Sequence, residues 1–228
     1  MRRILAVLAL AFLAACTTAN TRQFSETMAR PAPGAKILVV QPDISLALLT
    51  ATGIREPRAD WSQQGRDNIA GQLNTAVTAK GHTTEAFDPA AAMDGRVGQV
   101  LRLHQAVGQS ILFSNYSPVP LPTKKGAFDW TLGEGVKELG ASTGAQYALF
   151  TFGGGAYSSG GRATIAVIAA IGGVAIPLGS QQVFASLVDL NTGRILWSNV
   201  VTASPSSDMR EVTGAEVLVQ TLLKDAPL

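Results

Sequence analysis

The chain has 228 residues, within the range of a single domain, and 46% of them are hydrophobic, which is enough for a buried core. Its one cysteine excludes an intramolecular disulfide bond. With 18 basic and 16 acidic residues the net charge is only +2, so the composition gives no electrostatic case for a nucleic-acid partner.

The amino terminus combines two positive charges with a short apolar run. Arg2 and Arg3 precede the uncharged stretch 4–13, which is too short to cross a bilayer, since a spanning helix needs about 20 apolar residues. Its length is typical of the core of a secretory signal. A four-residue motif follows that resembles the lipobox of bacterial lipoproteins: Leu13, Ala14, Ala15 and Cys16. The resemblance implies that residues 1–15 are removed and that Cys16 carries lipid.

This resemblance also implies a location. Two or more acyl chains anchor a protein stably, because each buried CH2 contributes about 0.8 kcal/mol. Thr17 stands where many inner-membrane lipoproteins have Asp, so the resemblance favours the outer membrane, with the domain facing the periplasm. The alternative is an ordinary secretory signal that happens to lie near a cysteine. Loss of Arg2 and Arg3 leaves 18 − 2 = 16 basic against 16 acidic residues, a net charge of zero.

Residues 16–35 are polar at first and then rich in proline and glycine, with Pro31, Pro33 and Gly34. Such a segment has too little apolar surface to offset the entropy of ordering. We therefore expect a lipidated, flexible tether at 16–35 and one folded domain at 36–228.

The first half of that domain alternates strand and helix patterns. The apolar run 37–40 ends before a proline, which predicts a short buried strand, and residues 43–58 are expected to be irregular. Asp60 and Gln63 have capping-box spacing at the start of a helical pattern that ends at Gly81. The next predicted elements are a strand at 82–87, a helix beginning at 88 and a short helix at 132–139.

The second half holds the strongest strand patterns. Residues 147–152 are of β type, and the Gly/Ser-rich segment 153–161 predicts a loop. Residues 163–178 are apolar throughout, and we expect them to be a buried crossover packed on the sheet. A hairpin at 181–201 and a helix at 208–224 complete the pattern. Together these elements predict a single layered α/β domain with a mixed β-sheet, packed helices, and a C-terminal β-hairpin plus helix.

The hairpin carries the most recognisable motif, at 186–197, with Asp189, Thr192, Gly193 and Trp197. It resembles a blade hairpin of quinoprotein-like β-propellers, but a propeller needs four or more blades and this chain has one copy. It also resembles periplasmic lipoproteins related to the curli-export lipoprotein and to the amino-terminal domain of the Tol-system periplasmic protein. That resemblance implies envelope assembly or transport and no catalysis. A purely structural turn, with Gly193 at positive φ, explains the same residues.

Residues suited to catalysis or cofactor binding are few. Neither Gly-x-Ser-x-Gly nor His-Glu-x-x-His occurs. His104 lies on an apolar helix face and is expected to pack there, and His82 follows a helix end. Gly153 to Gly155 follow a strand, as in phosphate-binding loops, but the partner residues of that motif are missing. We therefore expect no enzyme activity, no cofactor and no metal site.

A proline-spaced segment is the candidate partner-binding loop. Alternating prolines hold an extended shape at low entropic cost and leave carbonyl groups free. A plain connector between helices is the alternative. The candidate residues are Pro118, Pro120, Pro122, Lys124 and Lys125.

Two functions follow from these observations. The first is a non-catalytic envelope lipoprotein, anchored through Cys16, that acts as an assembly or accessory factor and binds other envelope proteins. The alternative is a membrane-active or pore-forming export lipoprotein of the curli-export type. The sequence leaves open whether the chain is a homo-oligomer.

Overall fold

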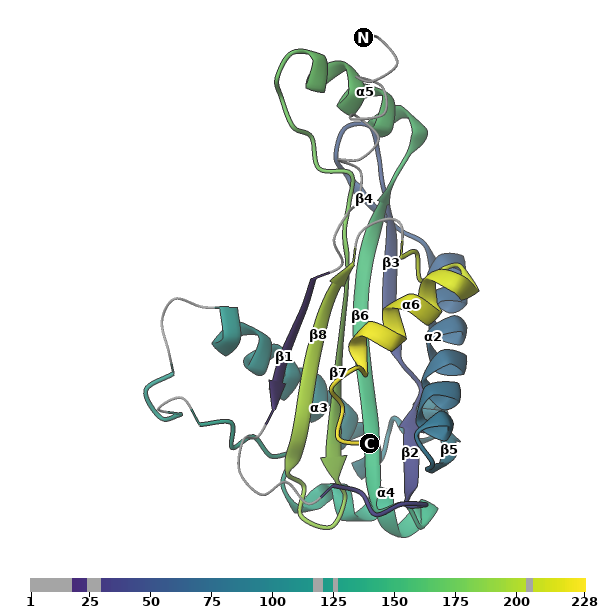
Figure 1. Cartoon of the computed structure of the whole chain (residues 1–228), viewed down its shortest axis with the longest axis vertical. Coiled ribbons are helices and arrows are strands. Elements are labelled where there is room, and N and C mark those ends of the chain that lie inside the picture. Colours follow the sequence, from purple (N-terminus) through teal and green to yellow (C-terminus); the bar gives the residue numbers. More distant parts are fainter. Residues whose placement is uncertain (1–17, 24–29, 117–120, 125–126, 204–206) are drawn as a thin grey trace, which may run out of the picture.

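The computed structural model describes residues 18–23, 30–116, 121–124, 127–203 and 207–228 (Figure 1). They form a mixed α/β fold in which helices cover a curled sheet, as predicted. The strands are β1 (Thr18–Gln23), β2 (Lys36–Val40), β3 (Asp43–Leu49), β4 (Arg55–Pro57), β5 (Thr83–Phe87), β6 (Tyr147–Ser158), β7 (Gln181–Asp189) and β8 (Ile195–Ala203). The helices are α2 (Ala59–Ala79), α3 (Arg96–Tyr116), α4 (Lys137–Thr143), α5 (Gly160–Ile171) and α6 (Val212–Leu222), with short 3-10 turns η1 (Pro89–Ala92) and η2 (Glu134–Val136).

The long strand β6 lies at the centre of the sheet, whose main order is β1-β8-β7-β6-β2-β5. On one side β6 pairs antiparallel with β7. On the other side β6 pairs in parallel with two strands in turn. It pairs first with β2 and then with β3, and the strand pairing is interrupted between them at Gln41 and Pro42. The prediction of an irregular segment at 43–58 is therefore wrong, because β3 and β4 fall within it.

Glycines let three backbones meet along β6. The predicted loop at 153–161 is wrong, because residues 153–158 continue β6, with Gly153 to Gly155 between β3 and β7, and α5 begins at Gly160. A Cβ atom added at Gly154 would overlap the Ser45 carbonyl oxygen, and one at Gly155 would lie 2.7 Å from the Ser180 carbonyl oxygen. Only residues without a side chain fit between the neighbouring strands.

The two faces of the sheet carry separate cores. Helices α2 and α6 cover one face, with Leu73 of α2 and Leu222 of α6 fully buried. Helices α3 and α4 cover the other, where Ile111 and Leu139 pack near Phe150. The apolar helix faces read from the sequence thus do meet the sheet.

Helix ends differ in detail from the prediction. The Asp60–Gln63 capping box does not form, because α2 begins one residue before Asp60 and Gln63 donates instead to Asp67. The predicted short helix does not stop at Gly140. It continues as α4 to Thr143 and is followed by Gly144, whose φ of 69° provides the left-handed capping residue.

The C-terminal hairpin is confirmed. Gly193 has a φ of 74°, the Asp189 carboxylate accepts from the Asn191 backbone N–H at 2.8 Å, and the Thr192 hydroxyl donates to it at 2.9 Å. Trp197 is fully buried opposite Leu187. The motif therefore has the structural role that its turn chemistry predicts.

Two segments lie where the sequence did not lead us to expect them. Residues 163–178 are not a buried crossover: they belong to α5 and to the segment after it, which project beyond one end of the sheet and are largely exposed (Figure 1). In addition, β1 falls inside the segment 16–35 that is predicted as a tether, and it pairs antiparallel with β8. The sheet thus begins two residues after Cys16.

The glycine run in β6 provides a stability test. Gly154→Ala should destabilise the lipid-free protein by roughly 1–3 kcal/mol, because the new methyl group must displace the β3 backbone. For a chain of this size that corresponds to about 2–4 °C of melting temperature per kcal/mol. The control is Gly71→Ala on α2, where a Cβ meets nothing within 4 Å and should stabilise the helix by about 0.5–1 kcal/mol. Equal melting temperatures for the two variants would contradict this packing.

Candidate functional site

The segment between β6 and β7, residues 159–180, is unusual because its apolar side chains are largely exposed. We call this segment the α5 excursion. Within α5 only Ala166 is buried. The exposed fraction of the side chain reaches 65% at Val167, 63% at Ile168 and 85% at Ile171. Burying one such side chain stabilises a protein by about 1.5–3 kcal/mol, and monomeric proteins rarely expose a contiguous apolar surface of this kind. The exposure therefore indicates a contact surface.

Beside the α5 excursion lies the turn that joins β3 to β4. A Cβ at Gly161 would sit 3.5 Å from the Ala51 Cβ, and one at Gly53 would sit 3.3 Å from the Arg162 Nη1. The next residue in the turn, Ile54, is 63% exposed. The turn 50–54 and the α5 excursion thus form one end of the molecule, here called the apex.

Hydrogen bonds fix the α5 excursion to the sheet. The Ser159 hydroxyl caps α5 by accepting from the Arg162 backbone N–H. The Ser158 hydroxyl donates to the Leu178 carbonyl at 2.7 Å, and the Arg162 Nε donates to the Pro177 carbonyl at 2.9 Å. The two ends of the excursion are therefore held close together.

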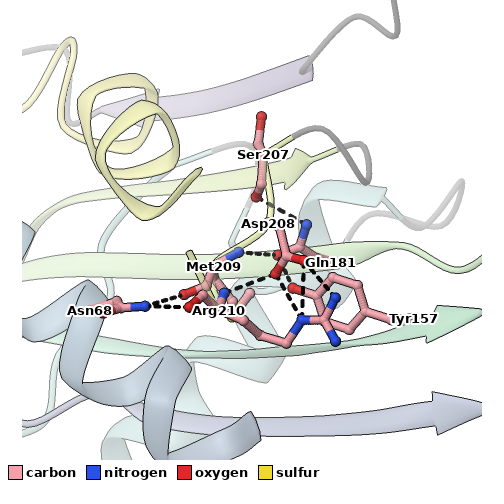
Figure 2. Close-up of polar contacts among 7 residues, drawn as sticks. All are labelled: Asn68, Tyr157, Gln181, Ser207, Asp208, Met209 and Arg210. Atoms are coloured by element: carbon pink, nitrogen blue, oxygen red, sulfur yellow. Dashed lines mark hydrogen bonds and ion pairs between the residues drawn. The ribbon is translucent and has the colours of Figure 1, made fainter. Parts of the chain in front are cut away.

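A buried polar network lies directly beneath, where β6 ends and β7 begins (Figure 2). The Tyr157 hydroxyl donates to the Gln181 Oε1 at 2.6 Å, which joins the two ends of the α5 excursion. The same oxygen accepts from the Met209 backbone N–H at 3.0 Å, and the Gln181 Nε2 donates to the Ser207 carbonyl at 3.0 Å. This network ties the base of the apex to the segment that leads into α6.

An ion pair completes the network. The Arg210 guanidinium donates to both oxygens of the Asp208 carboxylate, at 2.6 Å from Nη2 and 3.0 Å from Nε. Arg210 also lies over the Tyr157 ring, at 3.7 Å from the guanidinium carbon to the ring centroid, and over Trp61 at 4.4 Å. Asn68 of α2 donates to the Arg210 carbonyl at 2.7 Å. Figure 2 shows that Arg210, Asp208 and Asn68 are all held by contacts within the protein.

The charges of the network follow from these contacts. Burial raises the pKa of Tyr157, so its hydroxyl stays protonated and remains a donor. Burial alone would also raise the pKa of Asp208, but hydrogen bonds from Arg210 outweigh it and lower that pKa. The Asp208 hydrogen bond in turn raises the pKa of Arg210. At neutral pH Tyr157 is therefore neutral, Asp208 is negatively charged and Arg210 is positively charged. We call this network of Tyr157, Gln181 and residues 207–210 the clamp.

A cavity of about 320 Å³ lies at the break between β2 and β3. Phe150 and Phe152 form its apolar wall, and Arg66 and Asp88 lie among its charged lining residues. The buried Thr151 hydroxyl, also on its wall, has no hydrogen-bond partner among the described residues. The cavity thus combines apolar surface with one unsatisfied polar group.

His104 borders this cavity and is buried, as the sequence predicts. Its ring stacks on Phe150 with centroids 4.4 Å apart, and its Nε2 lies 2.7 Å from the Ser186 hydroxyl. Burial lowers the pKa of His104 to about 3, so the ring is neutral at pH 7. Ser186 is itself fully buried in β7. The pair has the geometry of a satisfied core contact.

The remaining residues singled out from the sequence are only partly placed. Cys16, the other three lipobox residues, Pro118, Pro120 and Lys125 lie outside the described residues. Pro122 is exposed. Lys124 forms an ion pair with Asp129 at 2.7 Å, and its Nζ lies 4.1 Å from the Trp130 ring centroid. Partner binding by this loop stays a prediction.

Sequence reasoning missed the clamp beneath the apex. Tyr157 and Gln181 are separated by the whole α5 excursion, and no sequence pattern links them. Only the pair Asp208 and Arg210, spaced like a turn before a helix, gave a local signal. Among the described residues, no helix is long and apolar enough to cross a membrane. The same residues contain no group of three or more His, Cys, Asp or Glu side chains that could hold a metal ion.

Comparisons with protein-family models and with curated proteins give no match. Among solved structures, a PelC dodecamer from Paraburkholderia phytofirmans is 16% identical, with 92% of this chain and 98% of that one covered and a TM-score of 0.42. The lipoprotein GNA1162 from Neisseria meningitidis is 14% identical, with 83% and 94% covered and a TM-score of 0.37. The LpoB C-terminal domain from Salmonella enterica is 14% identical, with 76% and 85% covered and a TM-score of 0.30. Likeness at this level assigns neither a family nor a function.

His104 provides a pH test. Its folded-state pKa lies below the ordinary value of about 6.5, so the unfolded chain binds the additional proton and stability is lost as the pH falls from about 6 towards 3. This group should contribute a slope of up to about 1.4 kcal/mol per pH unit in that window. Denaturant unfolding at several pH values should therefore show a shallower loss for His104→Gln than for the unsubstituted protein. Identical slopes would contradict a buried neutral ring.

Proposed function

We propose that this chain is a non-catalytic lipoprotein of the cell envelope, held to the outer membrane by lipid on Cys16 and acting as an assembly or accessory factor that binds other envelope proteins. The observation that carries the proposal is the position of β1. It begins two residues after Cys16 and pairs with β8 over its whole length. An anchor so close to the sheet holds the domain against the membrane, with little free chain between them.

The polar groups of the domain support a binding role over a catalytic one. In the network of Gln181 and residues 207–210, the polar groups form hydrogen bonds to other groups of the protein. Ser186 and His104, a serine–histidine pair among the described residues, are both buried, and the His104 Nε2 is engaged by the Ser186 hydroxyl. A nucleophile needs an accessible position next to its base.

The alternative, a membrane-active export lipoprotein of the curli-export type, is favoured by one observation, the exposed apolar helix α5. As a 12-residue helix, α5 is about 18 Å long, shorter than a hydrocarbon core of about 30 Å. Helix α5 alone therefore supplies a membrane contact and not a membrane-spanning wall.

The anchor is tested by Cys16→Ala and cell fractionation. The unsubstituted chain should be processed before Cys16, carry acyl chains in mass spectrometry and stay in the outer-membrane fraction. The variant lacks the acceptor thiol, so it should lose lipidation and appear in a soluble fraction. A variant that is processed at the same point and remains on the membrane to the same extent would overturn the anchor.

The partner-binding role is tested by photo-crosslinking in cells. A photoreactive residue at Pro122, which is exposed in the candidate loop, should form an adduct with an envelope protein identified by mass spectrometry. The matched control carries the same residue at Gly71, which is exposed on α2. The same adducts from both positions would argue against a binding site at the loop.

A further inference from the structure

The anchor and the α5 excursion leave the sheet at the same end. Thr18, the first residue of β1, lies opposite Thr202, and Gln181, which follows the α5 excursion, lies opposite Ala203. Cys16 precedes Thr18 by two residues, which span at most about 7 Å. A lipid on Cys16 would therefore enter its membrane at the end of the sheet from which the apex projects.

Apolar side chains dominate this end of the molecule. Half of the exposed large hydrophobic side chains in the described part of the chain belong to the α5 excursion, and Ile54 of the neighbouring turn adds one more. Those of the α5 excursion are Ile165, Val167, Ile168, Ile171, Val174 and Leu178. Four of them lie on α5 itself, and at 100° per residue they fall on one half of the helix, opposite the buried Ala166, so α5 presents one apolar face outward.

The apex carries very little charge. Within residues 50–54 and 159–180 the one charged residue is Arg162; Arg55 and Glu56, both exposed, follow the turn in β4. Arg162 lies in the first turn of α5, where its Nε donates to the Pro177 carbonyl near the return of the chain to β7. One cationic side chain at the start of an otherwise uncharged apolar segment matches the order of phosphate headgroups and acyl chains that a bilayer presents.

We propose that the apex is inserted into the interfacial region of the membrane that holds the Cys16 lipid, with α5 among the upper acyl chains and Arg162 at the headgroups. This rests on the proposed lipidation of Cys16. It adds a second, protein-borne membrane contact that would fix the orientation of the domain, because one flexible lipid attachment alone leaves it free to rotate. The length of α5 limits this contact to one leaflet.

The position of the anchor at the same end of the sheet favours lipid over a second copy of the chain as the contact of the α5 excursion. The Tyr157–Gln181 hydrogen bond and the Ser158–Leu178 hydrogen bond hold both ends of the excursion at the sheet, so it cannot fold back and cover itself. With the anchor beside it, the nearest apolar phase is the bilayer that receives the Cys16 lipid.

The test uses the full lipidated protein in vesicles of phosphatidylethanolamine and phosphatidylglycerol. Because the chain has one cysteine and lipid would occupy it, an introduced cysteine is the only free thiol. An environment-sensitive fluorophore is attached at Ile171→Cys in the α5 excursion or, as control, at Asn191→Cys in the exposed hairpin turn at the opposite end of the sheet. The label at 171 should be blue-shifted, quenched by bromolipids and at least about twofold less accessible to iodide than the label at 191.

A second pair of variants separates insertion from folding. In the Ile171→Cys background, Ile168→Asp should reduce bromolipid quenching while circular dichroism and melting stay unchanged, because residue 168 is exposed. Phe113→Asp, at a side chain of α3 exposed to 65%, should leave the quenching unchanged.

Two outcomes overturn the inference. A label at 171 as open to iodide as the label at 191 would show that the apex stays in water. A blue shift without bromolipid quenching would show that protein, such as a second copy, covers α5. Failure of the proposed anchor is recognised separately, because the protein would then lack acyl chains in mass spectrometry.

Discussion

The fold depends on the close approach of three backbones around Gly153, Gly154 and Gly155. There β6 is flanked by β3 and β7, and no side chain fits between them and the neighbouring carbonyl groups. The glycine run lets β6 continue past the end of β2 and carry the sheet onward with β3 as its new parallel partner. Without that extension β6 would stop in mid-domain, and the α5 excursion would have no base from which to project.

The sequence predicts well those features whose chemistry is local. The hairpin at Asp189–Gly193 depends on a turn that its own residues close, and the apolar faces of α2 and α6 repeat with the helical period. Burial of His104 follows in the same way from its place on such a face. Local signals of this kind need no knowledge of the neighbouring elements.

The errors arise where distant contacts decide. Glycines 153–155 have the composition of a loop, and only the neighbours β3 and β7 make them strand residues. The apolar stretch 163–178 has the composition of a core segment, yet the ends of the α5 excursion are fixed so that it points away from the sheet. The clamp at Tyr157, Gln181 and 207–210 joins segments far apart in the sequence, so no spacing rule could find it. The composition of residues 163–178 predicts that they contact other apolar groups, but it does not say whether those groups belong to the core of this domain or lie outside it.

The pairing of β1 with β8 has a mechanical consequence. The hydrogen bonds of an antiparallel ladder lie perpendicular to the strands. If the rest of the domain is held in place, a force on Cys16 along the axis of β1 would load all the hydrogen bonds between Thr18–Gln23 and β8 at once, in shear. A force directed across the sheet would instead break these hydrogen bonds one after another. A lipid on Cys16, if attached as proposed, would therefore transmit force along the sheet, and the attachment would resist tension along the axis of β1 better than tension directed sideways.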